Sequence, residues 1–209
     1  MPNPGQTSAE RLIAHGARRF PSSRLELFDK AGFLRPDLCA ELIALIDADR
    51  RPSTLTDSNG DHYFRTSETC YLPREHPAVD ELERRLFELN GIDPINGEPA
   101  QGQRYDIGQE FKQHTDYFEP HGVDYDANCG AYGNRTWTFM VYLNQPEAGG
   151  ATRFKVVGKT FQPETGRLLC WNNRRPDMSC NAATLHHGMK VRKSLKYVIT
   201  KWYREHPYI

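Results

Sequence analysis

Two histidines and one aspartate in this chain, His114, Asp116 and His186, are spaced as the ligands of a ferrous ion would be. Alternate residues of a β-strand point to the same face, so a strand through QHTD would place the His114 imidazole beside the Asp116 carboxylate. His186 precedes a second strand-like segment, from which it could supply the third ligand. Two histidines and one carboxylate with open coordination positions suit non-haem Fe(II) oxygenases, whereas zinc usually binds four ligands, or three and one water. Because a lone His-x-Asp pair is also common at solvated strand edges, this prediction depends on His186.

The open coordination positions predict an organic cosubstrate, and Lys196 and Tyr105 are candidates to bind it. If 2-oxoglutarate binds iron through its 1-carboxylate and 2-keto oxygen, its 5-carboxylate is buried and needs a buried cation. Strand periodicity places Lys196 on one face with Val198, Thr200 and Trp202, while Tyr105 could donate a hydrogen bond to the same carboxylate. The alternative is that Lys196 is a surface lysine on an edge strand, which is the commoner setting for lysine.

The residues before position 100 carry two helical patterns. The first begins at Pro36, has apolar residues every three or four positions, and ends near Arg51-Pro52, because the residue before a proline disfavours helix. The second lies between Pro77 and Asn90 and is followed by a glycine, a common helix stop. Between the two patterns, Asn59-Gly60 indicates a β-hairpin.

From Ala100 onward the apolar residues alternate instead of recurring at helical spacing. Strand candidates are the runs TWTFMVYL, RLLCW and KYVITKW, which are separated by turns that contain glycine or proline. Short strands after a helical lead predict an all-β core with flanking helices, an α+β arrangement. In it a double-stranded β-helix, or jelly roll, has N-terminal helices packed on one sheet. The length of 209 residues predicts a single domain, with residues 1–99 as a helical support region and 100–209 as the jelly-roll core.

The composition argues against several classes of protein. Lys and Arg together number 27, as do Asp and Glu, and no polybasic run occurs, so we do not expect nucleic-acid binding. No apolar stretch in the sequence is long enough to cross a bilayer and the first residues lack a signal-peptide pattern, which predicts a soluble cytoplasmic protein. The five cysteines are odd in number and lack zinc-ribbon spacing, so we expect reduced thiols.

The chain resembles the catalytic domain of the prolyl 4-hydroxylases, which are Fe(II)/2-oxoglutarate-dependent dioxygenases. The resemblance is carried by four segments: RYDIGQEFKQHTDYF, RTWTFMVYLNQPEAGGATRF, FQPETGRLLCWNN and LHHGMKVRKSLKYVITKW. It extends from about Arg65 to Tyr203 and implies O2 as a substrate and ascorbate as a possible reductant. It also implies roles for a set of site residues: His114, Asp116 and His186 as iron ligands, Lys196 and Tyr105 as partners of the 5-carboxylate, Thr152 and Trp202 as walls of the cosubstrate pocket, and Arg135 as a substrate contact.

The chain departs from the family pattern at three places. His187 follows His186 directly and is a rival ligand, but the family's ten-residue offset to Lys196 favours His186 and leaves His187 facing the opposite way. Phe111 stands where eukaryotic members commonly carry a substrate-contacting tyrosine, which weakens the case for a collagen-like substrate. Residues 120–135 are polar and rich in glycine, and they form either a surface loop or a lid over the substrate.

Three functional hypotheses follow. The first is a dioxygenase that hydroxylates an unactivated C–H bond of a prolyl residue in a peptide or protein and releases succinate and CO2. The second is a hydroxylase of a free amino acid or small metabolite. The third is a non-catalytic jelly-roll protein that only binds a divalent metal. The predicted partners of the 5-carboxylate favour the two enzymes, because a simple metal site does not need them.

Overall fold

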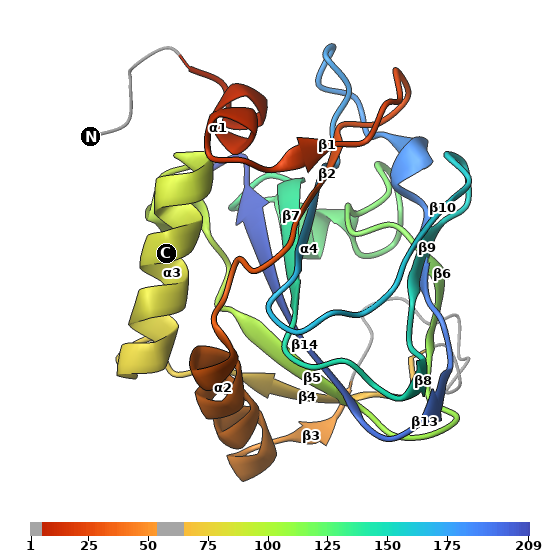
Figure 1. Cartoon of the computed structure of the whole chain (residues 1–209). Helices are drawn as coiled ribbons and strands as arrows, with labels where there is room; N and C mark the ends of the chain where they lie inside the picture. The colour runs from red at the N-terminus through yellow and green to blue at the C-terminus, as the bar shows by residue number, and fades with distance from the viewer. Residues whose placement is uncertain (1–5, 54–64) are drawn as a thin grey trace.

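Two antiparallel sheets face each other, with helices on one outer side, in the computed structural model, which describes residues 6–53 and 65–209 (Figure 1). This arrangement confirms the predicted all-β core with flanking helices and the jelly-roll architecture. The hairpin predicted at Asn59-Gly60 lies outside the described residues. In the described ranges, no helix combines the length and apolar character needed to cross a membrane.

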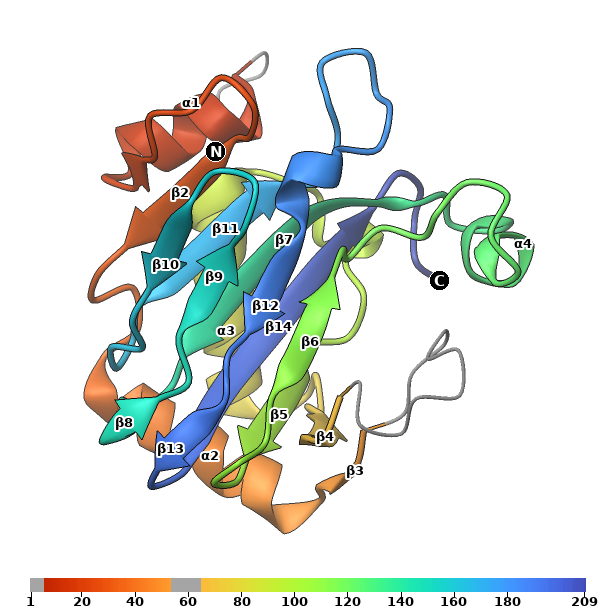
Figure 2. The same cartoon turned by 90° about the vertical axis from the view of Figure 1, so that its right-hand side faces the viewer.

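The main sheet has eight strands in the order β1-β2-β11-β7-β14-β5-β4-β3. Their bounds are β1 (Arg18–Arg19), β2 (Leu27–Lys30), β3 (Arg51–Pro52), β4 (Glu68–Tyr71), β5 (Gln101–Tyr105), β7 (Arg135–Tyr142), β11 (Leu168–Asn172) and β14 (Lys196–Arg204). The second sheet, in the order β10-β9-β12-β6, lies in front of it in Figure 2. Its strands are β6 (Phe111–His114), β9 (Thr152–Phe154), β10 (Lys159–Phe161) and β12 (His186–Gly188). A further short pair consists of β8 (Ala148–Gly149) and β13 (Val191–Lys193).

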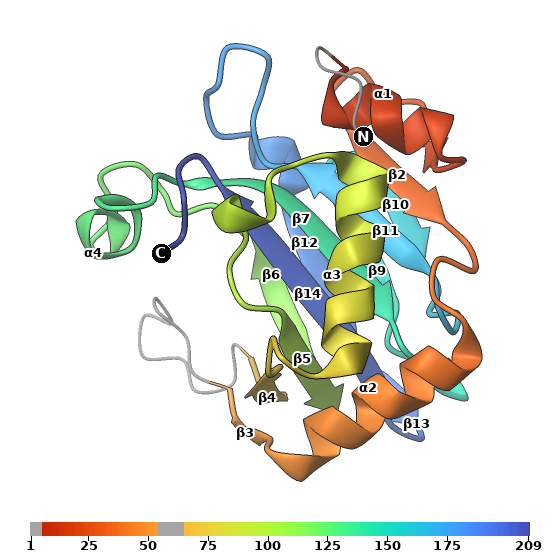
Figure 3. The ribbon, with the colours of Figure 1, turned by 90° about the vertical axis from the view of Figure 1, so that its left-hand side faces the viewer.

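The helices lie mainly on the outer face of the main sheet, where α2 (Pro36–Ala48) and α3 (Pro77–Asn90) cover it (Figure 3). Helix α3 has the predicted bounds and ends at Gly91, whose φ of 70° favours glycine. Helix α2 begins at the predicted proline and ends shortly before β3. Two shorter helices are α1 (Ser8–Ala14) and α4 (Tyr125–Cys129).

Strands β7 and β14 lie in the middle of the main sheet, and alternate side chains of each belong to two different cores. Ile199 of β14 and Phe139 of β7 pack in the core beneath the helices. Val198 of β14 and Met140 of β7 pack in the core between the two sheets. Burial on both faces explains why these strands carry few exposed residues, and it leaves the inner face of β14 available for a buried site.

The first 99 residues are less helical than predicted, because β1 to β4 also belong to the main sheet. These strands have only two to four residues, too few for alternation to be recognised in the sequence. Helix α1 was not predicted either. Its first turn carries a capping box between Thr7 and Glu10, a Thr-x-x-Glu pattern that is visible in the sequence.

Candidate active site

A cavity between the two sheets contains the residues predicted to bind metal and cosubstrate. Strands β5 and β14 form its wall on the main sheet, and β6, β9 and β12 form the opposite wall. The cavity holds about 410 Å³ of empty space, part of it open to solvent.

The three predicted metal ligands meet at one end of this cavity. His114 is the last residue of β6 and His186 the first residue of β12, and the two are partners in the antiparallel register. Asp116 Oδ1 lies 3.6 Å from His114 Nε2 and 4.0 Å from His186 Nε2. One ligand atom from each of the three residues lies within 4.8 Å of the others. Two imidazoles and one carboxylate converge here on a common point, which fits a ferrous ion with open positions toward the cavity.

Each of the two histidine rings is oriented by the backbone carbonyl group two residues before it. Nδ1 of His114 lies 2.7 Å from the carbonyl oxygen of Lys112, and Nδ1 of His186 lies 2.9 Å from that of Thr184. A carbonyl can only accept, so Nδ1 of each ring carries the proton and Nε2 keeps a lone pair for a metal. Burial, together with the neighbouring His186, lowers the pKa of His114 to about 3. His114 is therefore neutral at physiological pH, as a ligand must be.

The carboxylate of Asp116 is ionised despite its burial. Burial opposes ionisation, but attraction by His186, His114 and Arg135 and a hydrogen bond from Thr138 outweigh it, so the pKa of Asp116 is lowered. The Thr138 hydroxyl donates to Asp116 Oδ2 over 2.7 Å, which leaves Oδ1 toward the histidines. The arrangement favours a carboxylate that binds metal through one oxygen.

Replacing Thr138 by valine should weaken metal binding about 10- to 100-fold, the usual cost of losing a group that orients a ligand. Thr138 is itself held by Asn173, whose Nδ2 donates to its hydroxyl over 2.9 Å. Titration of the purified variant with Mn(II), followed by electron paramagnetic resonance, measures the effect. Thr136→Val is the matched control, because that hydroxyl lies on the same strand but bonds the carbonyl oxygen of Tyr203. Equal Mn(II) affinity in wild type and Thr138→Val would contradict the assigned role.

The other end of the cavity holds a buried cation. Lys196 begins β14 and is the register partner of Tyr105 in β5. Its side chain is 2% exposed, and its ammonium lies over the rings of Tyr105 and Tyr142, 4.9 and 5.5 Å from their centroids. Burial lowers the pKa of Lys196 to about 7, and no carboxylate among the described residues forms an ion pair with it. The alternative that Lys196 lies on an exposed edge is excluded by its burial, and the cavity has a place for an anion opposite the metal site.

Thr152 and Trp202 also line the cavity, as the family resemblance implied. The Thr152 hydroxyl accepts a hydrogen bond of 2.6 Å from Tyr142. Arg135 lies beside the cavity, where its guanidinium packs 3.9 Å from the centroid of the Trp202 ring and binds both carboxylate oxygens of Glu98 at 2.6 and 2.8 Å. The side chain is thus fixed by an ion pair, and its contact with substrate stays a prediction.

The structure shows where the three departures from the family pattern lie. His187 faces away from the metal ligands and pairs with Glu110, with 2.8 Å between Nε2 and Oε2. Phe111 stacks on the ring of His114, with centroids 3.5 Å apart. Residues 120–135 include α4, and Arg204 bonds the carbonyl oxygens of this segment at two points. A role as a lid stays a prediction.

Two groups of site residues were missed from the sequence. Thr138 and Asn173 form the hydrogen-bonded chain behind Asp116, and no sequence pattern marked it. Gln103 lines the cavity and donates to Thr200 over 3.1 Å. A signal for Gln103 existed, because it lies two residues before Tyr105 on a strand and therefore shares its face.

Comparison with known proteins agrees with this geometry. A family model described as the 2OG-Fe(II) oxygenase superfamily matches residues 100–204. Probable prolyl 4-hydroxylase 8 of Arabidopsis thaliana is 30% identical over 200 residues, covering 84% of this chain and 67% of the relative. Prolyl 4-hydroxylase subunit alpha-1 of Gallus gallus is 31% identical over 144 residues, covering 68% of this chain but only 28% of the relative.

A solved structure extends the agreement to three dimensions. The viral collagen prolyl hydroxylase vCPH from Paramecium Bursaria Chlorella virus-1, in a 2OG complex, superimposes with a TM-score of 0.68 and 26% identity. The match covers 85% of this chain and 95% of that structure. The family model spans half of the chain and includes the three metal ligands, Tyr105 and Lys196. The chain therefore belongs to the 2OG-Fe(II) oxygenase superfamily and is a 2-oxoglutarate-dependent dioxygenase.

Proposed function

We propose that this enzyme hydroxylates a prolyl residue of a peptide or protein. The observation that carries the proposal is a cavity with three metal-ligand donors at one end and, at the other, a buried Lys196 that forms no ion pair within the described part of the chain. The relatives and the viral structure supply the prolyl assignment, because their names describe prolyl hydroxylases. Neither a free amino acid nor a simple metal site is favoured by any contact in the cavity.

The chain's own residues have three tasks in this reaction. His114, Asp116 and His186 would hold Fe(II), and Lys196 with Tyr105 would hold the distal carboxylate of 2-oxoglutarate. When bound, iron, 2-oxoglutarate and O2 supply an oxidative decarboxylation that yields succinate and CO2 and hydroxylates a C–H bond. The apolar side chains between the two sheets limit the access of water to the reacting groups. No side chain has to remove a proton from the substrate carbon.

The test is hydroxylation of a synthetic proline-rich peptide. The purified protein is incubated with Fe(II), 2-oxoglutarate and O2, and the peptide is analysed by mass spectrometry. We expect a gain of one oxygen on a proline, together with an equal amount of succinate. The same peptide with alanine in place of each proline, and a reaction with free proline, are the controls. Succinate coupled to oxidation of free proline alone would contradict the proposal and favour the small-metabolite hypothesis.

Two further parts of the proposal concern conditions and location. Ascorbate is proposed as a reductant that sustains repeated turnover, and multiple turnovers with and without it measure the effect. A cytoplasmic location is proposed from the five free cysteines, four of which are buried, since such thiols persist in a reducing compartment. The balanced charge of 27 basic and 27 acidic residues supports a peptide rather than a nucleic acid as partner. Fractionation of the producing cells would locate the protein.

A further inference from the structure

Lys196 lies at the end of a strand, where pairing is incomplete. On one side β14 pairs with β5 from its first residue, so that Lys196 is opposite Tyr105. On the other side the register with β7 begins at Val198, opposite Tyr142, and one further backbone hydrogen bond, from Leu143 N–H to the carbonyl oxygen of Tyr197, leaves Lys196 itself without a strand partner there. Strand ends fray when their backbone groups lack partners, and a buried ammonium gains hydration by moving outward. Something must therefore hold this end of β14.

The side chain of Asn144 makes the hydrogen bonds that a longer β7 would otherwise make with this end of β14. Its Oδ1 accepts a hydrogen bond of 2.7 Å from the backbone N–H of Tyr197, and its Nδ2 donates over 2.8 Å to the carbonyl oxygen of Leu195. A carboxamide has one acceptor and one donor side, like a peptide group, so it continues the ladder of β7. The two bonds join the residues immediately before and after Lys196.

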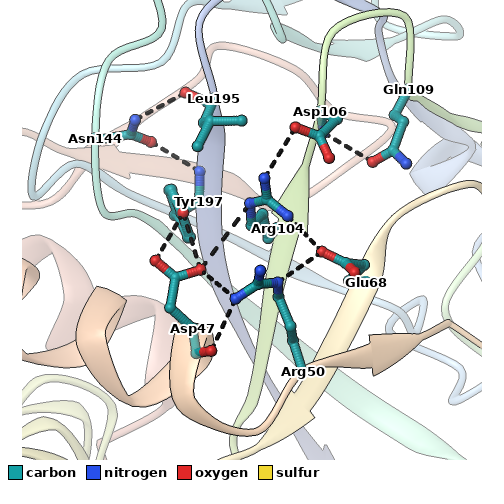
Figure 4. A network of polar contacts seen from close by, with 9 residues as sticks. All are labelled: Asp47, Arg50, Glu68, Arg104, Asp106, Gln109, Asn144, Leu195 and Tyr197. Carbon is teal, nitrogen blue, oxygen red and sulfur yellow. Dashed lines mark hydrogen bonds and ion pairs between the residues drawn. The ribbon is translucent and has the colours of Figure 1, made fainter.

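A network of hydrogen bonds and ion pairs on the outer face of the main sheet also holds the start of β14, from the side opposite the cavity (Figure 4). The Tyr197 hydroxyl lies 3.0 and 2.9 Å from the two carboxylate oxygens of Asp47, at the end of α2. Tyr197 is the register partner of Arg104, whose guanidinium binds Glu68 at 2.6 Å and Asp106 at 3.0 Å. The network therefore lies directly behind the Lys196 and Tyr105 pair and ties β14 and β5 to the helix layer.

The inner side confines the lysine stem as well. Gly150 has a φ of 72°, and a Cβ added there would lie 3.0 Å from Lys196 Cδ. The absent side chain leaves the space that the aliphatic stem fills. The space beside Gly150 confines the aliphatic stem, and the hydrogen bonds of Asn144 hold the backbone on both sides of Lys196. Because the stem has little freedom of its own, the position of the ammonium depends on those backbone hydrogen bonds.

We propose that Asn144 is a positioning residue for cosubstrate binding. It holds the backbone on both sides of Lys196 and so keeps the ammonium at the depth that the distal carboxylate of 2-oxoglutarate requires. This inference rests on the proposed function of the cavity and adds to it a residue that affects cosubstrate affinity through the position of Lys196. Asn144 itself touches neither metal nor cosubstrate.

The experiment measures 2-oxoglutarate binding directly, by isothermal titration of Mn(II)-loaded protein without O2. Asn144→Ala removes both hydrogen bonds, and we expect the Kd for 2-oxoglutarate to rise about tenfold. The kcat at saturating 2-oxoglutarate and the affinity for Mn(II) should stay within about twofold of wild type, because both metal-binding histidines lie on the other sheet and Asp116 follows one of its strands. Asn144→Asp can still accept from the Tyr197 N–H but cannot donate to the Leu195 carbonyl oxygen, so its Kd for 2-oxoglutarate should lie between those of wild type and Asn144→Ala. If the alanine variant does not fold, the Kd of Asn144→Asp tests the proposal.

Asn90→Ala is the matched control, since Asn90 also makes two side-chain hydrogen bonds but contacts the opposite end of β14 through Tyr203. An unchanged Kd in both Asn144 variants, or an equal rise in Asn90→Ala, would overturn the inference. Wild-type protein that binds 2-oxoglutarate but never hydroxylates a peptide would instead contradict the proposed function. The two failures are therefore distinguishable.

Discussion

Asp116→Ala should abolish succinate formation and peptide hydroxylation, and His114→Ala should do the same. Asp116 is the only acidic member of the metal group found among the described residues, and without it two neutral imidazoles must hold a dication. Removal also leaves the Thr138 hydroxyl without its acceptor, so the local hydrogen-bonded chain is lost as well. We expect activity at background level and Mn(II) binding too weak to saturate.

The measurements are succinate release and Mn(II) binding, each made on folded protein as judged by circular dichroism. Asp93→Ala and His15→Ala are matched controls, because these exposed residues lie outside the cavity and should retain wild-type activity. Turnover by Asp116→Ala at more than a small fraction of the wild-type rate would show that the metal is bound elsewhere.

Lys196→Met should raise the KM for 2-oxoglutarate by at least about 100-fold while leaving metal binding intact. Methionine keeps the unbranched stem but removes the charge, so the distal carboxylate would be buried without a cation. Breaking a buried ion pair costs about 3–5 kcal/mol, and about 1.4 kcal/mol corresponds to a tenfold change in Kd. Isothermal titration with 2-oxoglutarate measures the loss, and an unchanged KM would remove Lys196 from the cosubstrate site.

The same lysine predicts how affinity depends on pH. Burial lowers the pKa of Lys196 to about 7 in the free protein, and only the ammonium form attracts a carboxylate. Affinity for 2-oxoglutarate should therefore be maximal below pH 7 and fall up to about tenfold per pH unit above it. Tyr105 and Tyr142, which pack on the ammonium, stay neutral across this range because burial raises the pKa of both. The Lys196→Met variant should lack this dependence, and a flat wild-type profile between pH 7 and 9 would contradict it.

The sequence was informative where a pattern repeats over many residues. Helix α3 has enough turns for its apolar stripe and its glycine stop to be recognised, and β14 has enough residues for alternation to assign Lys196 and Trp202 to one face. Strand periodicity also placed Asp116 beside His114, and the two do lie together, but β6 ends at His114 and Asp116 follows it in a bend. The local regularities were therefore sufficient for the architecture and for the membership of the metal site, but not for the backbone that carries Asp116.

The sequence was uninformative where a role depends on tertiary contacts. Nothing local distinguishes Thr138 from Thr136, the other threonine of its strand, since its role comes from the carboxylate that a different segment brings to it. The same holds for Arg135, whose ion pair with Glu98 joins two segments far apart in the chain. Strands as short as β1 and β3 are also formed by their neighbours in the sheet rather than by their own composition.

The register between His114 and His186 has a consequence for how this protein folds. The two residues are distant in sequence, yet β6 and β12 must pair before their imidazoles can meet. Contacts of this kind close a long loop and form late, after local helices such as α3. The complete set of ligands is assembled only in the folded protein, so a bound metal should stabilise the native state by mass action. We therefore expect the metal-loaded protein to resist proteolysis longer than the metal-free protein.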